Sequence, residues 1–300
     1  MLNIERLTEP VDAVGECPVW RATEAALYWV DIPAKRIHRL QIETGKTDTW
    51  TTTAMVACIA FRHDGTLIAG MEDGIYSLSL LANGTAATTP LAALSMPMPN
   101  MRFNDGRCDR QGRFWAGTMH MDMAAGHAVG GLFRYTLADG LSSPVVDNLL
   151  TQNGLAWSPS GDLMYLSDSH PKSQLVWVFD YDIATGSPVN RRLFVDMNQH
   201  PGRPDGAAVD TDGCYWTCAN DAGQLLRFTP AGKLDRSITL PVKKPSMCAF
   251  GGANFDTLYV TSIRPQKETD LVEQPFAGAV FALRPGVRGL PEPEFGRHQK

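Results

Sequence analysis

The sequence predicts an all-β fold, a six-bladed β-propeller in which residues 1–300 form a single domain. Three observations predict it. Glycine (27) and proline (20) are abundant among the 300 residues, as expected of a chain with many tight turns. No window of helix length carries the apolar stripe of an amphipathic helix. A set of strand-like segments recurs six times, at the spacing of propeller blades.

The first repeated segment is a turn followed by a short strand of aromatic and aliphatic residues. Its copies include ATEAALYWVDI, DRQGRFWAGTM and DTDGCYWTCAN. Aligned on one strand position, the six copies place in register Leu27, Leu67, Phe114, Met164, Tyr215 and Leu258. These positions are 40, 47, 50, 51 and 43 residues apart, which is the size of a blade built from several short strands.

The second repeated segment follows each copy of the first and alternates apolar and polar residues, as in IHRLQIETGK and LFRYTLADG. Such alternation predicts a strand, and the glycine turn at its end predicts a hairpin. A further strand is expected near residues 3–7. We expect it to pair with the last blade and close the ring, because closure removes exposed sheet edges.

A third segment of small and apolar residues precedes each copy of the first. It reads GECPVW in the first unit and PDGAAVD in the fifth, and we expect it to form the innermost strand of each blade, beside a central channel. The residues at the heads of these strands are Glu16, Ala57, Asn104, Asn153, Asp205 and Ser246. Because inner strands converge on the axis, we expect these residues to be neighbours in the fold.

Four of the head residues carry side-chain oxygens that can bind a metal: Glu16, Asn104, Asn153 and Asp205. Two carboxylates with one or two amide oxygens suit a divalent cation, which also relieves the repulsion between the carboxylates. No His or Cys set has the spacing of a zinc site. The alternative is that Asn-Gly and Asp-Gly serve only as turns. Glu16 is not a turn former, so the equivalent positions favour a metal site in the central channel.

Charge and composition argue against several partners. The formal net charge of −5 argues against nucleic acid or an anionic membrane. No apolar run reaches the roughly 18 residues of a membrane span, and MLNIERLTEP does not read as a signal peptide. Six cysteines without a Cys-x-x-Cys pair favour reduced, buried thiols over a metal ligand or nucleophile. We therefore expect a cytoplasmic protein, a monomer or a small homo-oligomer.

The order of the motifs resembles a known family. GECPVW, RFNDGRCD, FWAGTMH, NGLAWSPSG and RPDGAAVD follow one another between Gly15 and Gly289. This set is similar to the senescence-marker-protein/gluconolactonase family, which includes regucalcin and bacterial sugar lactonases. The resemblance implies a six-bladed propeller with one divalent cation in its central channel, in agreement with the repeats. Calcium, zinc, magnesium, manganese and iron all remain open as that cation.

The resemblance also implies roles for individual residues. The Glu of GECPVW, the Asn of NGLAW and the Asp of PDGAAVD match the metal ligands of the family, which gives Glu16, Asn153 and Asp205. The Arg and first Asn of RFND match its substrate contacts, which gives Arg102 and Asn104.

An acidic substrate contact that some members carry after Gly-Thr-Met is harder to assign. The nearest match is Asp122, one methylene shorter than the usual Glu. His120 directly follows the Gly-Thr-Met motif and is the other candidate for part of this role.

The function implied by the resemblance is metal-dependent hydrolysis of a sugar (aldono-) lactone to the sugar acid. A divalent cation can polarise the lactone carbonyl and lower the pKa of a bound water, and we hypothesise that Asp205 also acts as the general base. Two alternatives remain open: an organophosphate-type hydrolase on the same cation, and a non-catalytic calcium-binding propeller. The pair Arg102 and Asn104 weighs against the second, because a protein that only holds a cation needs neither.

Potentially cationic side chains surround the same expected pocket. The loop 121–131 (MDMAAGHAVGG) lacks a strand pattern and contains His127, and we expect it to form a lid over the channel. His170 and Lys172 follow a strand end, and Arg203 lies just before Asp205. These residues suggest a substrate lactone with an additional anionic group. A neutral aldonolactone from glucose, galactose, arabinose or xylose is the default.

Overall fold

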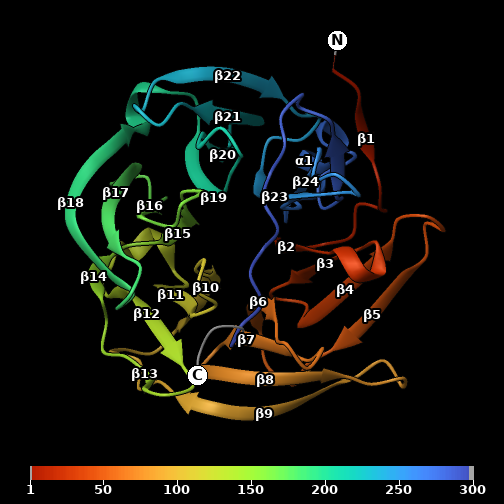
Figure 1. The fold of residues 1–300 in the computed structure, drawn as a ribbon. Coiled ribbons are helices and arrows are strands. Elements are labelled where there is room, and N and C mark those ends of the chain that lie inside the picture. The colour runs from red at the N-terminus through yellow and green to blue at the C-terminus, as the bar shows by residue number, and fades with distance from the viewer. Residues whose placement is uncertain (1, 297–300) are drawn as a thin grey trace.

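A computed structural model describes residues 2–296 of the chain. Six antiparallel sheets stand around one axis, with the first strand of each sheet innermost (Figure 1). The predicted all-β, six-bladed propeller is thereby confirmed. Each sheet is a meander of short strands joined by tight turns, so the glycines and prolines serve the turns between strands.

The first three blades follow the chain from the centre of the ring outward. Blade 1 contains β2 (Gly15–Arg21), β3 (Ala26–Asp31), β4 (Arg36–Gln41) and β5 (Thr47–Thr51). Blade 2 contains β6 (Val56–Phe61), β7 (Leu67–Met71), β8 (Gly74–Leu80) and β9 (Ala86–Ala93). Blade 3 contains β10 (Met101–Cys108), β11 (Phe114–His120), β12 (Gly130–Thr136), β13 (Gly140–Leu141) and β14 (Val146–Leu149).

The last three blades have the same meander. Blade 4 contains β15 (Gln152–Trp157), β16 (Leu163–Asp168), β17 (Leu175–Asp182) and β18 (Ser187–Asp196). Blade 5 contains β19 (Arg203–Val209), β20 (Tyr215–Asn220), β21 (Gln224–Phe228) and β22 (Leu234–Thr239). Blade 6 contains β23 (Pro245–Gly251), β24 (Thr257–Ser262), β25 (Phe281–Leu283) and the N-terminal β1 (Ile4–Arg6).

Strand β1 closes the ring, as the sequence predicts. It pairs antiparallel with β25, with Ile4 opposite Leu283 and Arg6 opposite Phe281. The N-terminal segment thus supplies the outer strand of a blade whose other strands come from the end of the chain. This pairing ties the two ends of the propeller together and covers an edge that would otherwise be open.

Every inner strand contains a β-bulge or similar irregularity at its head residue or directly after it. The register with the second strand shifts at Glu16/Val19, Val56/Cys58, Phe103/Gly106, Asn153/Ala156, Pro204/Ala207 and Pro245/Cys248. A bulge leaves one residue out of the ladder and turns its side chain away from the regular alternation. The repeated bulge is therefore the local feature that sets the direction of the six head side chains.

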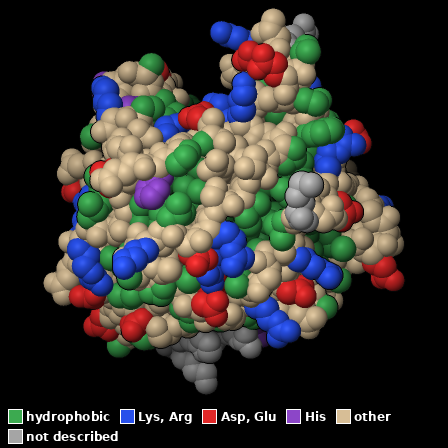
Figure 2. All heavy atoms as spheres, turned by 90° about the horizontal axis from the view of Figure 1, so that it is seen from above, with side chains coloured by type: hydrophobic (Ala, Val, Ile, Leu, Met, Phe, Trp, Pro, Cys, Tyr) green, Lys and Arg blue, Asp and Glu red, His purple; other side chains and the backbone are tan. Residues whose placement is uncertain are grey.

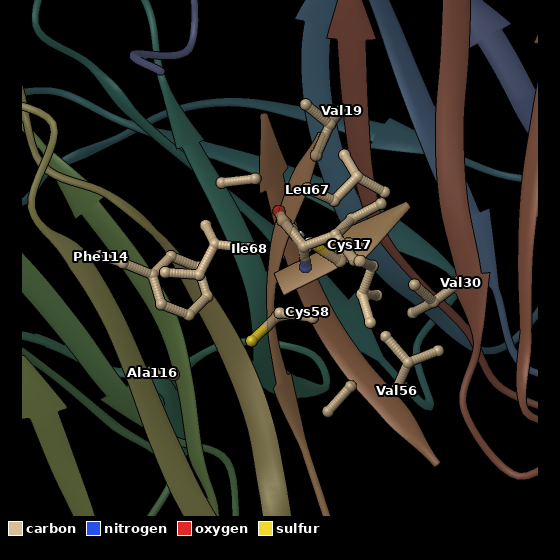
Figure 3. Packing of buried hydrophobic residues seen from close by; sticks show 14 of the residues in the cluster. Cys17, Val19, Val30, Val56, Cys58, Leu67, Ile68, Phe114 and Ala116 are labelled. Atoms are coloured by element: carbon tan, nitrogen blue, oxygen red, sulfur yellow. Dashed lines mark hydrogen bonds between the residues drawn. The ribbon is translucent and has the colours of Figure 1, made fainter. Parts of the chain in front are cut away.

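The core fills the space between neighbouring blades with apolar side chains. Figure 3 shows a part of it, where Cys17 of β2 and Cys58 of β6 pack among Val19, Val30 and Val56. All six cysteines are buried and unpaired, which agrees with the expectation of buried, reduced thiols. Burial raises the pKa of Cys17 to about 12, so this thiol stays protonated and acts as a small apolar residue.

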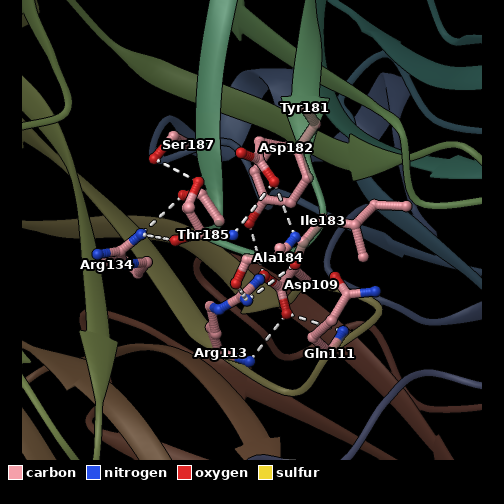
Figure 4. Close-up of polar contacts among 11 residues, drawn as sticks. Asp109, Gln111, Arg113, Arg134, Tyr181, Asp182, Ile183, Ala184, Thr185 and Ser187 are labelled. Carbon is pink, nitrogen blue, oxygen red and sulfur yellow. Dashed lines mark hydrogen bonds and ion pairs between the residues drawn. The ribbon is translucent and has the colours of Figure 1, made fainter.

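Polar contacts join blades 3 and 4 away from the axis (Figure 4). Asp109 accepts hydrogen bonds from the Tyr181 hydroxyl (2.5 Å) and the Arg113 guanidinium (2.9 Å). Arg113 also donates to the carbonyl oxygens of Ile183 and Ala184, in the turn between β17 and β18. One arginine thus links the β10–β11 turn of blade 3 to an outer turn of blade 4.

The segment after β25 crosses the ring at the end opposite the head residues. Glu294 pairs with Arg21 at 2.6 Å, Glu292 pairs with Arg107 at 3.2 Å, and the buried Phe295 donates its amide to the carbonyl oxygen of Phe61. A cavity of ≈ 350 Å³ lies between this segment and the inner strands of blades 1–3. This segment is irregular, and the repeat pattern does not predict it.

The structure adds one short helix to the expected strands. Helix α1 (Glu268–Glu273) lies in the long connection between β24 and β25, and with six residues it is too short to carry a periodic apolar stripe. Within residues 2–296, no helix is long and apolar enough to cross a membrane. Acidic and basic side chains are interspersed over the face shown in Figure 2.

Candidate metal and substrate site

The four polar head residues are buried at one end of the central channel. Glu16, Asn104, Asn153 and Asp205 are between 5% and 8% exposed. They come from the inner strands of blades 1, 3, 4 and 5, and each lies at the bulge of its strand. The other two head positions carry Ala57 and Ser246, so the polar set is asymmetric around the axis.

Direct hydrogen bonds connect the blade 3 and blade 4 members of this set. The Asn104 side-chain Nδ2 donates to Asn153 Oδ1 at 3.0 Å and to the carbonyl oxygen of Gln152 at 2.7 Å. The Asn153 Nδ2 donates to Ser169 Oγ at 2.7 Å. These bonds fix the Asn153 amide, and its Oδ1 keeps one lone pair for a further partner.

Gly154 permits the bulge that follows Asn153. Its φ is +61°, a conformation that side chains rarely adopt. A Cβ at this position would also lie 2.5 Å from both Ser167 Oγ and the Tyr215 hydroxyl. The glycine of the Asn-Gly pair is therefore required by backbone geometry, and this pair forms part of the bulge in β15 instead of a hairpin turn.

Arg102 lies against the same cluster. Its Nη1 donates to Asn104 Oδ1 at 2.8 Å and to the carbonyl oxygen of Phe103 at 2.7 Å. Burial lowers the pKa of Arg102 to about 10, although the negative charge of Glu16 opposes this change. The guanidinium is therefore charged at neutral pH and close enough to Glu16 to interact with it.

Few hydrogen bonds offset the cost of burying the carboxylates of Glu16 and Asp205. Burial raises the pKa of Asp205 to about 7, although a 2.6 Å hydrogen bond from Asn220 to Oδ2 opposes this change. Burial also raises the pKa of Glu16 well above its ordinary value, and the charges of Asp205 and Asp105 raise it further. Among residues 2–296, only the Cys17 amide donates a hydrogen bond to the Glu16 carboxylate, at 3.3 Å.

Asp105 is a third buried acid beside this pair, and it is not among the site residues that the sequence predicts. Its Oδ2 accepts a hydrogen bond from the Leu155 amide at 2.9 Å, whereas its buried Oδ1 has no hydrogen-bond partner among the residues that the structure describes. Burial raises its pKa. In the sequence, this acid belongs to an Asn-Asp-Gly tripeptide, which is typical of a turn. Only the position of the tripeptide inside a strand shows that it does not form one here.

These residues fit a divalent cation. Two buried carboxylates and an amide oxygen form the donor set of a hard cation, and a cation would offset the mutual repulsion that raises the pKa of Glu16. Within residues 2–296, no three His, Cys, Asp or Glu side chains are grouped closely enough to hold a metal. A cation here would therefore depend on the Asn153 amide as well as on Glu16 and Asp205.

His120 and Asp122 lie in the connection between β11 and β12. His120 is buried, its Nδ1 is 3.1 Å from the carbonyl oxygen of Asp122, and its ring meets that of His127 edge-on at 5.0 Å. The Asp122 carboxylate is exposed and accepts a hydrogen bond from the Ala124 amide at the start of the short 3₁₀ helix Met123–Ala125. Its substrate-contact role stays a prediction.

Known proteins resemble the chain over nearly its whole length. The family model of the SMP-30/gluconolactonase/LRE-like region matches residues 14–264. The 6-deoxy-6-sulfogluconolactonase of Pseudomonas putida is 38% identical over 284 residues, which cover 94% of each chain. Human regucalcin is 33% identical over 282 residues, which cover 92% of each chain.

A solved structure has the same fold. The calcium-binding protein regucalcin of Agrobacterium tumefaciens superposes with a TM-score of 0.90 at 24% identity, covering 98% of this chain and 97% of its own. Fold, motif order and sequence identity thus agree across the whole propeller. The chain belongs to the SMP-30/gluconolactonase/LRE-like family.

Proposed function

We propose that the protein hydrolyses a sugar lactone to the corresponding sugar acid, with one divalent cation held by Glu16, Asn153 and Asp205. The observation that carries the proposal is the group of two buried, poorly compensated carboxylates and a fixed amide, next to the Arg102–Asn104 pair. The names of the relatives support it, since one is a sugar lactonase and another a calcium-binding protein. Calcium is the first ion to test, and residues 1–300 are proposed to act as one domain.

When bound, the cation would supply Lewis-acid chemistry, polarising the lactone carbonyl and lowering the pKa of a coordinated water. The Asp205 carboxylate is proposed as the general base. Asn220 holds its Oδ2, which leaves Oδ1 to accept a proton from the attacking water. The water oxygen bonds to the carbonyl carbon, the ring C–O bond breaks, and the proton passes to the departing ring oxygen, so atoms and charge balance.

Arg102 and Asn104 are proposed to hold the sugar. The Arg102 Nη1 is already engaged with Asn104 and Phe103, so its other guanidinium hydrogens are the ones that can reach a hydroxyl or carbonyl oxygen. Both Asn104 Nδ2 hydrogens are engaged as well. Asn104 therefore orients Arg102 and Asn153 and can itself accept at most one hydrogen bond from the substrate.

Two substitutions of Asp205 test its proposed roles. Asp205→Ala should abolish lactone hydrolysis, because it removes a cation ligand and the base together. Asp205→Asn keeps an oxygen ligand but cannot accept the proton, so kcat should fall by about 10²-fold or more while some cation binding remains. Acid release from the lactones of glucose, galactose, arabinose and xylose measures the rate, after subtraction of spontaneous hydrolysis.

Asp64→Asn is the matched control. Asp64 is an exposed acid in the β6–β7 turn of blade 2, at the end of the blade opposite the strand heads. It should leave the rate unchanged. A near-normal rate for Asp205→Asn would rule out the general-base role. The absence of acid release by the wild-type protein from every lactone, with each cation supplied, would leave an organophosphate-type hydrolase or a non-catalytic, cation-binding propeller.

A further inference from the structure

The loop 121–129 is attached to blade 4 by a buried histidine. His170, directly after β16, places its Nε2 at 2.8 Å from the carbonyl oxygen of Met123, and its Nδ1 accepts a hydrogen bond from the Lys172 amide. Since a carbonyl can only accept and Nδ1 here accepts, Nε2 is the nitrogen that donates to Met123. This bridge fixes the position of the loop relative to the β16–β17 connection.

This bridge lies at the same blade boundary as the candidate site. Asn104 of blade 3 bonds to Asn153 of blade 4, and Asn153 in turn donates to Ser169 Oγ. Ser169 is the residue immediately before His170. The connection that contains Lys172 is therefore tied to the Asn104–Asn153 pair through adjacent residues, and it borders the same end of the channel.

Lys172 contacts the loop that carries His127 at this boundary. The Lys172 Nζ lies over Gly126, 2.6 Å from where a Cβ of that residue would stand, and Gly126 precedes His127 in the loop. The φ of Gly126 is +64°, and a side chain here would push the ammonium away. His127 is exposed, with its ring packed edge-on against His120.

No acid forms an ion pair with Lys172 or His127 within residues 2–296. Neither Lys172 nor His127 has a carboxylate within 4.0 Å, whereas the nearby Arg203 and Lys244 both pair with Asp221. The two acids of the adjoining connections are engaged with backbone amides: Asp122 with Ala124, and Asp168 with Leu150 and Thr151. The boundary thus presents the Lys172 ammonium, which has no carboxylate partner among the described residues, against the loop that carries the exposed His127.

We propose that the substrate of this site is an anionic sugar lactone, whose charged group lies at the end of the molecule away from the lactone carbonyl and binds to Lys172 and His127. This inference rests on the proposed lactonase function. With the carbonyl directed toward Glu16 and Asp205 and the ring toward Arg102, the far end of the sugar reaches the blade 3–4 boundary. A sulfonate, a carboxylate or a phosphate monoester shares the required chemistry, and Lys172 acts as the specificity-determining residue.

The test compares matched lactones on the cation-loaded protein. Glucono-1,5-lactone is the neutral member, and its 6-sulfo (6-deoxy), 6-carboxy and 6-phospho analogues are the anionic ones. The wild-type protein should have at least about tenfold higher kcat/KM for one anionic lactone than for the neutral one, since a charged pair near a closed site contributes about that much. Comparison of the three analogues identifies the anion.

Substitution of Lys172 then separates charge recognition from catalysis. Lys172→Gln should reduce the ratio of anionic to neutral kcat/KM by about five- to tenfold, mainly through a higher KM, and His127→Gln should reduce it less. Lys172→Arg should retain most of the preference, because the charge is kept. The wild-type preference should also decline with added salt. Lys233→Gln, at an exposed lysine in the β21–β22 turn, is the control and should not change the ratio.

Two results would overturn the inference while the proposed function stands: equal or better hydrolysis of the neutral lactone by the wild-type protein, or an unchanged ratio in Lys172→Gln. Failure to hydrolyse any lactone with any cation is a different result. It would remove the proposed function, and the inference with it.

Discussion

Glu16 and Cys17 illustrate how single residues determine this site. Cys17 has a φ of +49° without being glycine, directly after the buried Glu16. Backbone in this region is costly for a residue with a side chain and persists only where its surroundings fix it. Here the Cys17 thiol contacts the backbone of Ile59 in the next blade, with Sγ 3.2 Å from the Ile59 amide nitrogen. The neighbouring blade therefore stabilises the bulge that orients Glu16.

Part of the residue detail could be predicted from the sequence. The sequence predicts equivalent places in the fold for Glu16, Asn153 and Asp205, because each occupies the same position in a local repeat. The sequence does not predict the hydrogen bond between Asn104 and Asn153, nor the burial of Asp105. They depend on contacts between strands that lie about 50 residues apart in the sequence, which no local pattern encodes.

Asp12 offers a test of buried charge away from the site. Burial raises its pKa to about 7, although a hydrogen bond from Trp29 Nε1 at 2.7 Å opposes this change. The neighbouring His38, whose Nε2 is 3.4 Å from Asp12 Oδ1, has its pKa lowered to about 4, also by burial. Both side chains are therefore more stable in the folded protein when neutral, and Asp12 is protonated over much of the acidic range.

A raised pKa has a defined consequence for stability. The contribution of Asp12 is fully present below its unfolded pKa of 3.8 and is lost as the pH rises through about 7. Asp12→Asn keeps an acceptor for Trp29 and cannot ionise. Its free energy of unfolding, relative to wild type, should increase by about 4 kcal/mol between pH 4 and pH 8. Urea denaturation at several pH values measures this difference.

His38 is present in both proteins, so its opposite contribution, present above about pH 6.5 and lost as the pH falls through about 4, largely cancels. Asp48→Asn is the control. Hydrogen bonds from Lys46 and Arg39 lower the Asp48 pKa, so its contribution is present above the ordinary value and the difference should change in the other direction. Parallel pH curves for Asp12→Asn and wild type would show that Asp12 is ionised in the folded state.

At the scale of elements, the link between blades 3 and 4 makes a clear prediction. Asp109 is fully buried, and Arg113, which is 13% exposed, is its cationic partner within the described part of the chain. Arg113→Ala would leave that carboxylate unpaired and remove the bonds to Ile183 and Ala184. Removal of one partner from a buried pair costs about 3–5 kcal/mol, so we expect a loss near the lower end of this range and a lower Tm.

Arg192→Ala is the control, an exposed ion pair within blade 4. Arg192 pairs with Asp180, and both side chains are 46% exposed, so its removal should cost less than about 1 kcal/mol. Thermal denaturation followed by circular dichroism measures both losses. Equal losses would contradict the view that buried links hold the blades together.

The sequence predicts a strand wherever apolar and polar residues alternate or where apolar residues form a short run. The three inner strands of each blade fall into this class, and the pairing of β1 with β25 followed from the need to close the ring. The outermost strands of blades 1–5, such as β5 and β22, correspond to none of the repeated segments. Helix α1 and the segment that carries Phe295 did not follow. Their placement depends on contacts with distant parts of the chain, such as the bond between Phe295 and Phe61, and their own residues carry no periodic pattern.

At the scale of the whole molecule, the site exists only because the ring closes. Glu16, Asn153 and Asp205 come from three blades, and nearly 190 residues separate the first from the last. Only a closed propeller brings three strand heads to one end of one channel. The opposite end is covered by the segment that contains Glu292 and Glu294, so substrate can approach the site from the end that the loop 121–129 borders.

The central claim is that lactone hydrolysis takes place on a cation held by Glu16, Asn153 and Asp205. The most direct test is the rate of acid release by chelator-treated protein, titrated with calcium and then with zinc, magnesium, manganese and iron(II). The account predicts a rate near the spontaneous background without cation, and a rise that saturates at one ion per chain and is absent in Asp205→Ala. A stripped protein that hydrolyses lactones as fast as the loaded one would contradict it.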